Sequence, residues 1–221
     1  MTKTIIVYGG TFDPLHDGHL LCVEAAKATF PHAAVHVYPT YIPLVDDTDQ
    51  CKKPLLTFAE RTCLLQRHFA ADARVLVSTL EKDLPLPNLT YNLVQSLSRR
   101  YPQVKFILLC GQDQYQHFAA WEGAQALLLA GCDLAVIARP DALPIATITA
   151  ALAKKFAFTL VDKQGCYCHA KFSIYSINHA QLAVSSTEVR AALRNKNCPD
   201  NVPAVVSNYL EHKFAKITNR R

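Results

Sequence analysis

Short runs of apolar and β-branched residues alternate along this chain with longer segments in which apolar residues recur every three or four positions. Runs typical of β-strands lie at residues 5–8, 34–38, 74–78, 104–110, 132–138, 156–161 and 171–177. Segments typical of helices lie at 20–28, 57–69, 90–100, 144–155, from 185 onward and at 202–214. This alternation predicts an α/β fold, a Rossmann-like doubly wound parallel sheet.

Local signals refine the pattern. Thr57 and Glu60 have the spacing of a capping box, and Thr90 stands where a helix N-cap is expected. The continuous apolar run at 104–110 is typical of a central strand that is buried on both faces. Residues 79–89 contain two prolines, so we expect no regular structure there. We expect one domain over 1–221, in which about 185–221 form a small C-terminal helical subdomain.

Composition excludes several classes of protein. With 221 residues the chain can bury a sizeable core, and no apolar run approaches the ~20 residues of a membrane span. The eight cysteines are scattered, mostly within apolar segments, and the chain starts directly with a strand pattern, so we expect reduced core thiols and a cytoplasmic protein. The formal charge of +5 comes partly from the last residues, so it does not predict a nucleic-acid partner. A homo-oligomer is allowed but not indicated.

A glycine-rich segment follows the first strand: Gly9-Gly10-Thr11-Phe12-Asp13-Pro14-Leu15-His16-Asp17-Gly18-His19. It lies where a strand passes into a helix, and a helix N-terminus offers unpaired N–H groups and a partial positive charge. Glycines let a ligand approach the backbone, as at Gly9, Gly10 and Gly18. His16 and His19 are three residues apart, so both can reach one point beside that helix end. We therefore predict a site for a phosphorylated nucleotide.

Other interpretations of the two histidines remain open. They could be separately satisfied core or surface residues, and a glycine pair after a strand can be a simple turn. A zinc site is disfavoured because the segment offers no further ligand except Asp13 and Asp17. Beside a polyphosphate, either imidazole would favour its charged form.

A second segment of the same kind precedes a helix near the C-terminus. It reads Val184-Ser185-Ser186-Thr187-Glu188-Val189-Arg190, and Ser185 and Glu188 have capping-box spacing. Hydroxyl groups at a helix N-terminus with an arginine one turn later can hold a phosphate. The alternative is a capped helix with a solvent-facing arginine.

Residues 9–20 resemble the signature of the nucleotidyltransferases that carry a His-x-Gly-His motif. Within that superfamily the chain is most similar to the nicotinate (or nicotinamide) mononucleotide adenylyltransferases. The Ser-Ser-Thr-x-Val-Arg segment at 185–190 matches the family's second motif. The resemblance implies transfer of the adenylyl group of ATP, with Mg²⁺, to a pyridine mononucleotide in NAD biosynthesis.

The resemblance also implies roles for residues of this chain. His16, His19 and Arg190 would act on the phosphates during the reaction. The residues expected to bind ATP are Gly9, Gly10, Phe12, Gly18, Arg139, Ser185, Ser186 and Thr187. Those expected to bind the mononucleotide are Thr11, Lys53, Thr90, Asp113 and Trp121. No protein metal ligand is implied.

Several of these positions depart from the family's pattern or have simpler interpretations. The family's Pro-His-Lys segment is Cys51-Lys52-Lys53 here, so either lysine could serve or neither. Asp141 replaces the glycine of the family's Arg-Pro-Gly. Thr90 and Asp113 could be helix caps, and Trp121 could be a core aromatic. The pyridine substituent that the protein prefers, carboxylate or carboxamide, stays open.

Residues 166–169, Cys-Tyr-Cys-His, have the look of a metal knuckle. No second cysteine pair stands at zinc spacing, so we expect a hairpin-like insertion between two strands. Rival functions are a sister transferase, such as a pantetheine-phosphate adenylyltransferase or a cytidylyltransferase, and a non-catalytic nucleotide- or RNA-binding module.

Overall fold

A computed structural model describes residues 3–43, 54–139, 142–178, 186–194 and 200–218, without the side chains of 194 and 214–218. The elements are β1 (Lys3–Gly10), α1 (Asp17–Thr29), β2 (Ala34–Pro39), α2 (Phe58–His68), β3 (Val75–Val77), the 3₁₀-helix η2 (Leu80–Asp83), α3 (Thr90–Arg100), β4 (Val104–Gly111), α4 (Gln112–Phe118), α5 (Ala124–Leu129), β5 (Asp133–Ile137), α6 (Ile145–Phe156), β6 (Val161–Lys163), β7 (Cys166–Cys168), β8 (Ser173–Ile177), α7 (Ser186–Arg194) and α8 (Ala204–Thr218).

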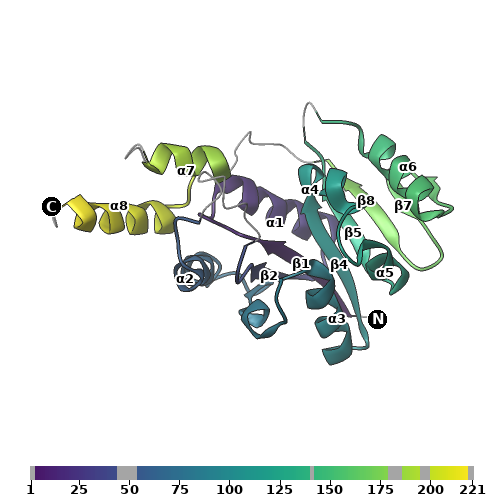
Figure 1. The fold of residues 1–221 in the computed structure, drawn as a ribbon, viewed down its shortest axis with the longest axis horizontal. Coiled ribbons are helices and arrows are strands. Elements are labelled where there is room, and N and C mark those ends of the chain that lie inside the picture. The colour runs from purple at the N-terminus through teal and green to yellow at the C-terminus, as the bar shows by residue number, and fades with distance from the viewer. Residues whose placement is uncertain (1–2, 44–53, 140–141, 179–185, 195–199, 219–221) are drawn as a thin grey trace.

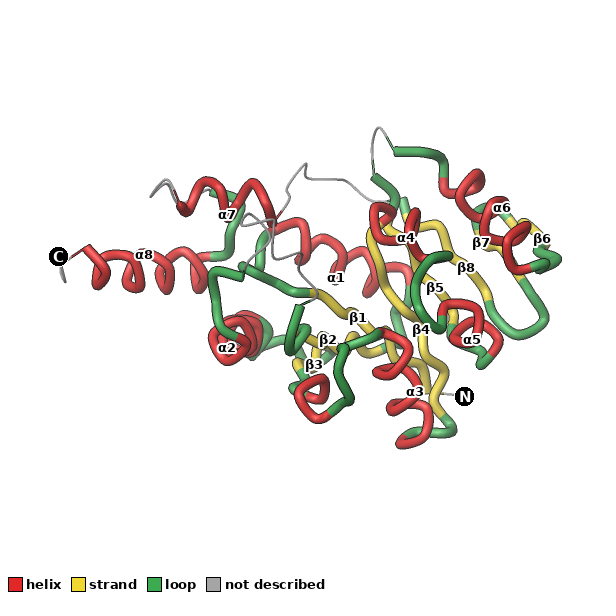
Figure 2. The backbone as a smooth tube through the Cα atoms, viewed as in Figure 1, coloured by secondary structure: helices red, strands yellow, loops and turns green. Residues whose placement is uncertain are grey.

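One sheet of eight strands runs through the described molecule in the order β3-β2-β1-β4-β5-β8-β7-β6 (Figures 1 and 2). Neighbouring strands in the series β3-β2-β1-β4-β5-β8 pair in parallel, whereas β7 pairs antiparallel with both β8 and β6. The prediction of a doubly wound parallel sheet is confirmed, apart from this antiparallel edge, which is the hairpin expected around residues 166–169.

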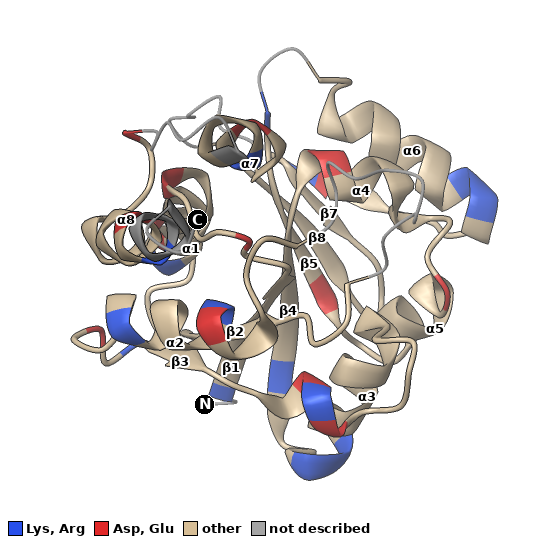
Figure 3. Ribbon diagram, turned by 60° about the vertical axis from the view of Figure 1, so that its left-hand side comes forward, with Lys and Arg blue, Asp and Glu red and all other residues tan. Residues whose placement is uncertain are grey.

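Helices cover both faces of the sheet and define two apolar cores (Figure 3). On one side, α1, α2, α7 and α8 bury side chains such as Val23, Leu65 and Val206. On the other, α3, α4, α5 and α6 bury side chains such as Leu93, Phe118 and Leu152. Because α7 and α8 share the core of α1, the C-terminal segment is fastened beside the start of α1. The subdomain boundary near 185 and the single domain over 1–221 stay predictions.

Three local expectations were wrong. Residues 80–83 form the 3₁₀-helix η2 although prolines follow at 85 and 87. Thr90 is the first residue of α3 and Leu89 occupies the N-cap position, so Thr90 does not cap the helix.

The third error concerns the strand expected at 156–161. Helix α6 continues to Phe156 and ends at Ala157, whose φ of 55° is left-handed, and β6 begins only at Val161. The apolar residues between them pack instead of pairing: the Phe158 ring lies 5.1 Å from the ring of Phe172. The apolar residues of this run therefore pack in the core and do not pair in the sheet.

No helix in the described part of the chain has the length and apolar character to cross a bilayer. The six cysteines within the described ranges are all free thiols, as expected. Cys110 and Cys132 are buried, but Cys63 on α2 is exposed, which corrects the expectation that the thiols belong to the core.

Candidate active site

The loop between β1 and α1 is held in a tight, strained form. Phe12 is 2 % exposed and has a φ of 51°, a left-handed conformation that bulky residues rarely adopt. Its ring packs edge-on against Tyr8 and His19, at 5.2 and 5.0 Å between centroids. A Cβ at Gly10 would lie 3.0 Å from this ring, so any other residue there would crowd Phe12. Gly9 has open space around it, which leaves room beside the backbone at the end of β1.

The two histidines of the motif meet, as their spacing predicted. His16 is the N-cap residue of α1, and its backbone N–H donates to Nδ1 of His19 over 3.3 Å. The two rings are stacked, with centroids 3.7 Å apart. His16 is 4 % exposed, whereas His19 is only partly buried. The pair therefore presents one buried imidazole at the N-cap and one partly buried imidazole in the first turn of α1.

The C-terminal motif lies against this pair. Ser186, the first residue of α7, has its Oγ 3.0 Å from Nε2 of His16, a contact between residues 170 positions apart. Arg190, 7 % exposed, donates from Nη1 to the backbone oxygen of Asp13 over 3.0 Å and from Nη2 to Oγ1 of Thr187 over 3.2 Å. The two motifs therefore form one site. In this geometry Arg190 links the motif loop to α7.

Burial keeps both imidazoles neutral in the ligand-free protein. Desolvation, followed by the charges of Arg139 and Arg190, lowers the pKa of His16 to about 4. Desolvation, followed by the proximity of His16 and Arg139, also lowers the pKa of His19. Both rings are therefore neutral near pH 7 and surrounded by arginine charge. Such positively charged surroundings favour the binding of an anion.

Two buried charged residues hold the motif loop, and the sequence analysis gave neither a role in the site. The Asp13 carboxylate is 0 % exposed and accepts the backbone N–H groups of Leu55 and Leu56 over 2.7 and 2.9 Å. Burial raises the pKa of Asp13, although these two hydrogen bonds oppose the change. The carboxylate thereby ties the motif loop to the start of α2.

Arg61 on α2 is the second of these residues and is 2 % exposed. Its guanidinium donates to the backbone oxygen of Thr11 over 2.7 Å and to that of Thr40 over 2.8 Å. It therefore joins the loops that follow β1 and β2. A signal was present in the sequence, because Arg61 stands in the apolar stripe of an amphipathic helix with Leu64 and Leu65.

Arg139 and Asp113 form a second group at the same edge of the sheet. Arg139 follows β5, Asp113 lies in the first turn of α4 after β4, and Nε of Arg139 is 3.4 Å from Oδ1 of Asp113. Gln112 fixes the segment by accepting the Arg139 N–H over 2.6 Å and donating to the backbone oxygen of Leu143. Both charged side chains are about half exposed, 46 and 50 %, and so are accessible to a ligand.

The remaining predicted residues are less closely connected to this group. Trp121 is partly buried and lies 5.3 Å from Phe118 between ring centroids, at the margin of the second core. Its turn adjoins the start of α3, since a Cβ at Gly123 would lie 2.4 Å from Cγ of Tyr91. Thr90 is therefore near the Trp121 turn. The lysines at 52 and 53 and Ser185 lie outside the described residues.

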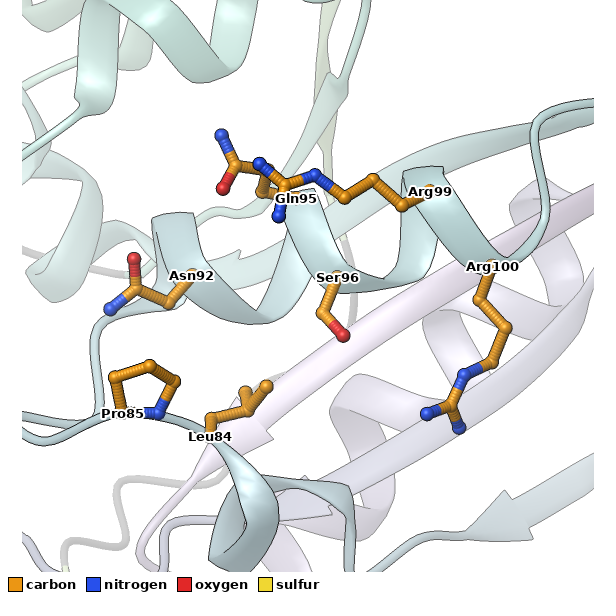
Figure 4. A pocket seen from close by; sticks show the side chains of 7 residues that line it. All are labelled: Leu84, Pro85, Asn92, Gln95, Ser96, Arg99 and Arg100. Atoms are coloured by element: carbon orange, nitrogen blue, oxygen red, sulfur yellow. The ribbon is translucent and has the colours of Figure 1, made fainter.

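A pocket of about 450 Å³ lies along α3 (Figure 4). It is lined by Leu84, Pro85, Asn92, Gln95, Ser96, Arg99 and Arg100. In Figure 4 the Ser96 side chain points into the space between α3 and the Leu84–Pro85 segment, whereas the Gln95 and Arg99 side chains lie on the other side of the helix. None of the predicted site residues that the structure describes lines it.

Comparisons with known proteins agree with this geometry. The chain is 25% identical over 211 residues to a Geobacter sulfurreducens protein named "Probable nicotinate-nucleotide adenylyltransferase", which covers 94% of this chain and 95% of that one. It is 28% identical over 213 residues to a protein of the same name from Desulfotalea psychrophila, and that alignment covers 94% of this chain and 97% of the relative. The structure resembles that of Plasmodium falciparum nicotinic acid mononucleotide adenylyltransferase complexed with NaAD, with a TM-score of 0.71, 20% identity and 96% of each chain covered.

This structural similarity confirms the predicted Rossmann-like fold. The sequence profile of the cytidylyltransferase-like family matches residues 7–192, a range that includes both motifs and every strand between them. The predicted membership of the nucleotidyltransferase superfamily is thus confirmed: the chain belongs to the cytidylyltransferase-like family.

Proposed function

We propose that this protein transfers the adenylyl group of ATP to nicotinate mononucleotide, which yields deamido-NAD and pyrophosphate. The observation that carries the proposal is the contact between His16 and Ser186, which brings the N-termini of α1 and α7 to one place. Two helix N-termini that face one point form a strong site for a polyphosphate. The names of the relatives from Geobacter sulfurreducens and Desulfotalea psychrophila support the choice of reaction.

In the proposed reaction an oxygen of the mononucleotide phosphate attacks the α-phosphorus of ATP. A new P–O bond forms as the bond to the β-phosphate breaks, and pyrophosphate leaves. The attacking oxygen belongs to the substrate itself, so the reaction needs no nucleophile from the protein, and we assign catalysis to positioning and charge stabilisation. Mg²⁺ enters as part of the substrate, Mg-ATP, and neutralises phosphate oxygens.

The histidines would hold the triphosphate. His19 is the more exposed of the pair and stands beside the first turn of α1, so we place it at the α-phosphate. The triphosphate would favour the charged imidazole and so counteract the burial that lowers the pKa of both rings. Arg190 is enclosed by Asp13 and Thr187, and we assign it to the β- and γ-phosphate end together with the N-terminus of α7.

The mononucleotide would lie on the other side of the motif loop. Gly9, Gly10 and Thr11 provide the backbone for its phosphate, because the space at Gly9 is open. Asp113 can accept hydrogen bonds from ribose hydroxyls. Arg139 forms an ion pair with Asp113, and its charge also acts on His19. Thr90 and Trp121 are assigned to the pyridine end, with Lys53 as the candidate phosphate ligand from outside the described residues. A cytoplasmic location stays a prediction.

Pyrophosphate release tests the proposal. The purified chain is mixed with Mg-ATP and, separately, nicotinate mononucleotide, nicotinamide mononucleotide and phosphopantetheine. We expect the highest kcat/KM with nicotinate mononucleotide. Pyrophosphate release only with phosphopantetheine would identify a sister transferase. Absence of pyrophosphate release with all three acceptors would favour a binding module. Either result contradicts the proposal.

A further inference from the structure

The edge of the sheet opposite β3 carries a pair of thiols that adenylyl transfer does not use. Cys166 and Cys168 are two residues apart on β7, so both side chains point to the same face of the strand. Their sulfur atoms are 3.6 Å apart, and both side chains are partly exposed. This distance is van der Waals contact between two free thiols.

Cross-strand pairing identifies the face on which the thiols lie. Cys166 is opposite Tyr175 on β8, whose ring packs at 5.1 Å from Phe30 at the end of α1. Tyr167, between the thiols, points to the other face, where it packs against the second core. The thiols therefore lie on the α1 side of the sheet.

That face is open to solvent beside the thiols. On β6, Val161 is opposite Cys168 and is 56 % exposed, and Lys163 is opposite Cys166 and is also exposed. A ligand can therefore reach both sulfur atoms from solvent.

We propose that Cys166 and Cys168 form a two-thiolate binding site for a soft metal cation of the Zn²⁺ and Cd²⁺ class, at the β6–β7–β8 edge of the sheet. Two sulfur ligands at about 2.3 Å from a tetrahedral metal are about 3.8 Å apart, close to the separation seen here. Binding breaks two S–H bonds, forms two metal–sulfur bonds and releases two protons to solvent.

The surrounding residues define the site further. Among the residues that the structure describes, no group of three or more His, Cys, Asp or Glu side chains could hold a metal. His169 is not part of the pair's face, because its ring stacks on Phe172, a residue of the second core. Water or a small solute thus completes the coordination, so the site is accessible and exchangeable rather than a closed structural centre.

Cadmium titration of the reduced full-length chain tests this site. Bound thiolates give an ultraviolet sulfur-to-cadmium charge-transfer band, and we expect it to saturate at about one Cd²⁺ per chain. Cys166→Ser and Cys168→Ser should each abolish the band, and Zn²⁺ but not Mg²⁺ should displace Cd²⁺. Cys63→Ser, which removes the exposed lone thiol of α2, is the matched control and should keep it.

The β7 variants should keep far-ultraviolet circular dichroism and pyrophosphate release within about two-fold of the unmodified chain, because the pair lies outside the motif site. A band that survives Cys166→Ser or Cys168→Ser would overturn the proposal. So would loss of the band in Cys63→Ser, or its absence from the reduced chain.

Discussion

Polar side chains are buried in one region of the sheet and exposed in another. At the carboxyl end of β1, Asp13, His16 and Arg61 are each at most 4 % exposed and are engaged by backbone or side-chain partners. At the β6–β7 edge, the polar residues are partly or fully exposed, and the thiols contact one another.

This difference shows what each region can tolerate. Burying polar and charged groups is costly unless they have partners, so the motif loop depends on the hydrogen bonds of Asp13 and Arg61 that fix it before a ligand arrives. The fold of the edge hairpin depends little on the contacts of its side chains. Substitutions at the first region should therefore cost activity or stability, whereas substitutions at the second should change only metal binding.

The largest effect is expected at His19. Removal of one charge-stabilising group usually lowers the rate about 10²–10³-fold, so His19→Ala should lower kcat for pyrophosphate release by that factor. His32→Ala, an exposed histidine just after α1, is the control and should keep normal turnover. Turnover of His19→Ala within a few-fold of the unmodified chain would refute this role.

Arg61→Ala should destabilise the fold by about 3 kcal/mol, because it removes a buried guanidinium and leaves the partly buried carbonyl groups of Thr11 and Thr40 without this donor. Urea unfolding monitored by circular dichroism measures this. Arg67→Ala, an exposed arginine on the same helix, should change stability by less than about 0.5 kcal/mol. Equal effects of the two substitutions would show that Arg61 does not hold the loops.

Glu81 gives a pH dependence of opposite sign to that of most carboxylates. Burial raises its pKa to about 7, against the backbone hydrogen bond from Tyr41 and the charge of Arg61. Between pH 4.5 and 7 the folded state binds more protons than the unfolded state, so stability falls as pH rises through this window. We expect about 3 kcal/mol of this loss to disappear in Glu81→Gln.

Unfolding free energies at pH 5, 6, 7 and 8 check this prediction. Glu24→Gln, at a carboxylate whose side chain is 57 % exposed, should keep the slope of the unmodified chain. A Glu81→Gln chain with an unchanged slope would assign the pH dependence to another group.

The smallest effect is expected at Ser186. A neutral hydrogen bond contributes about 1 kcal/mol, so Ser186→Ala should lower kcat/KM for ATP roughly five-fold through its contact with His16. Thr187→Ser keeps a hydroxyl for Arg190 and should change kcat/KM by less than about two-fold. A larger loss in Thr187→Ser than in Ser186→Ala would reverse the assignment of the two hydroxyls.

The sequence predicted what depends on local spacing. The strand–loop–helix at 5–28, the His16–His19 meeting and the capped helix after Thr57 follow from patterns within a few residues, and the structure confirms them. The buried run at 104–110 likewise indicated the central strand β4.

Other features depend on contacts between distant segments, and no local pattern specifies those. Arg61 acts on loops that lie 21 and 50 residues earlier in the chain. Phe158 was predicted in a strand because its apolar run fits a sheet or a core equally well, and packing against Phe172 decided between them. The zinc knuckle was set aside on spacing alone, whereas the distance between two sulfur atoms can only be measured in the fold.

The most direct test of the central claim is a crystal structure with Mg²⁺ and a non-hydrolysable ATP analogue. The account predicts one triphosphate within hydrogen-bonding distance of His19 and of the first turn of α7, near Ser186 and Arg190. A triphosphate that contacts only one of the two motifs would contradict it.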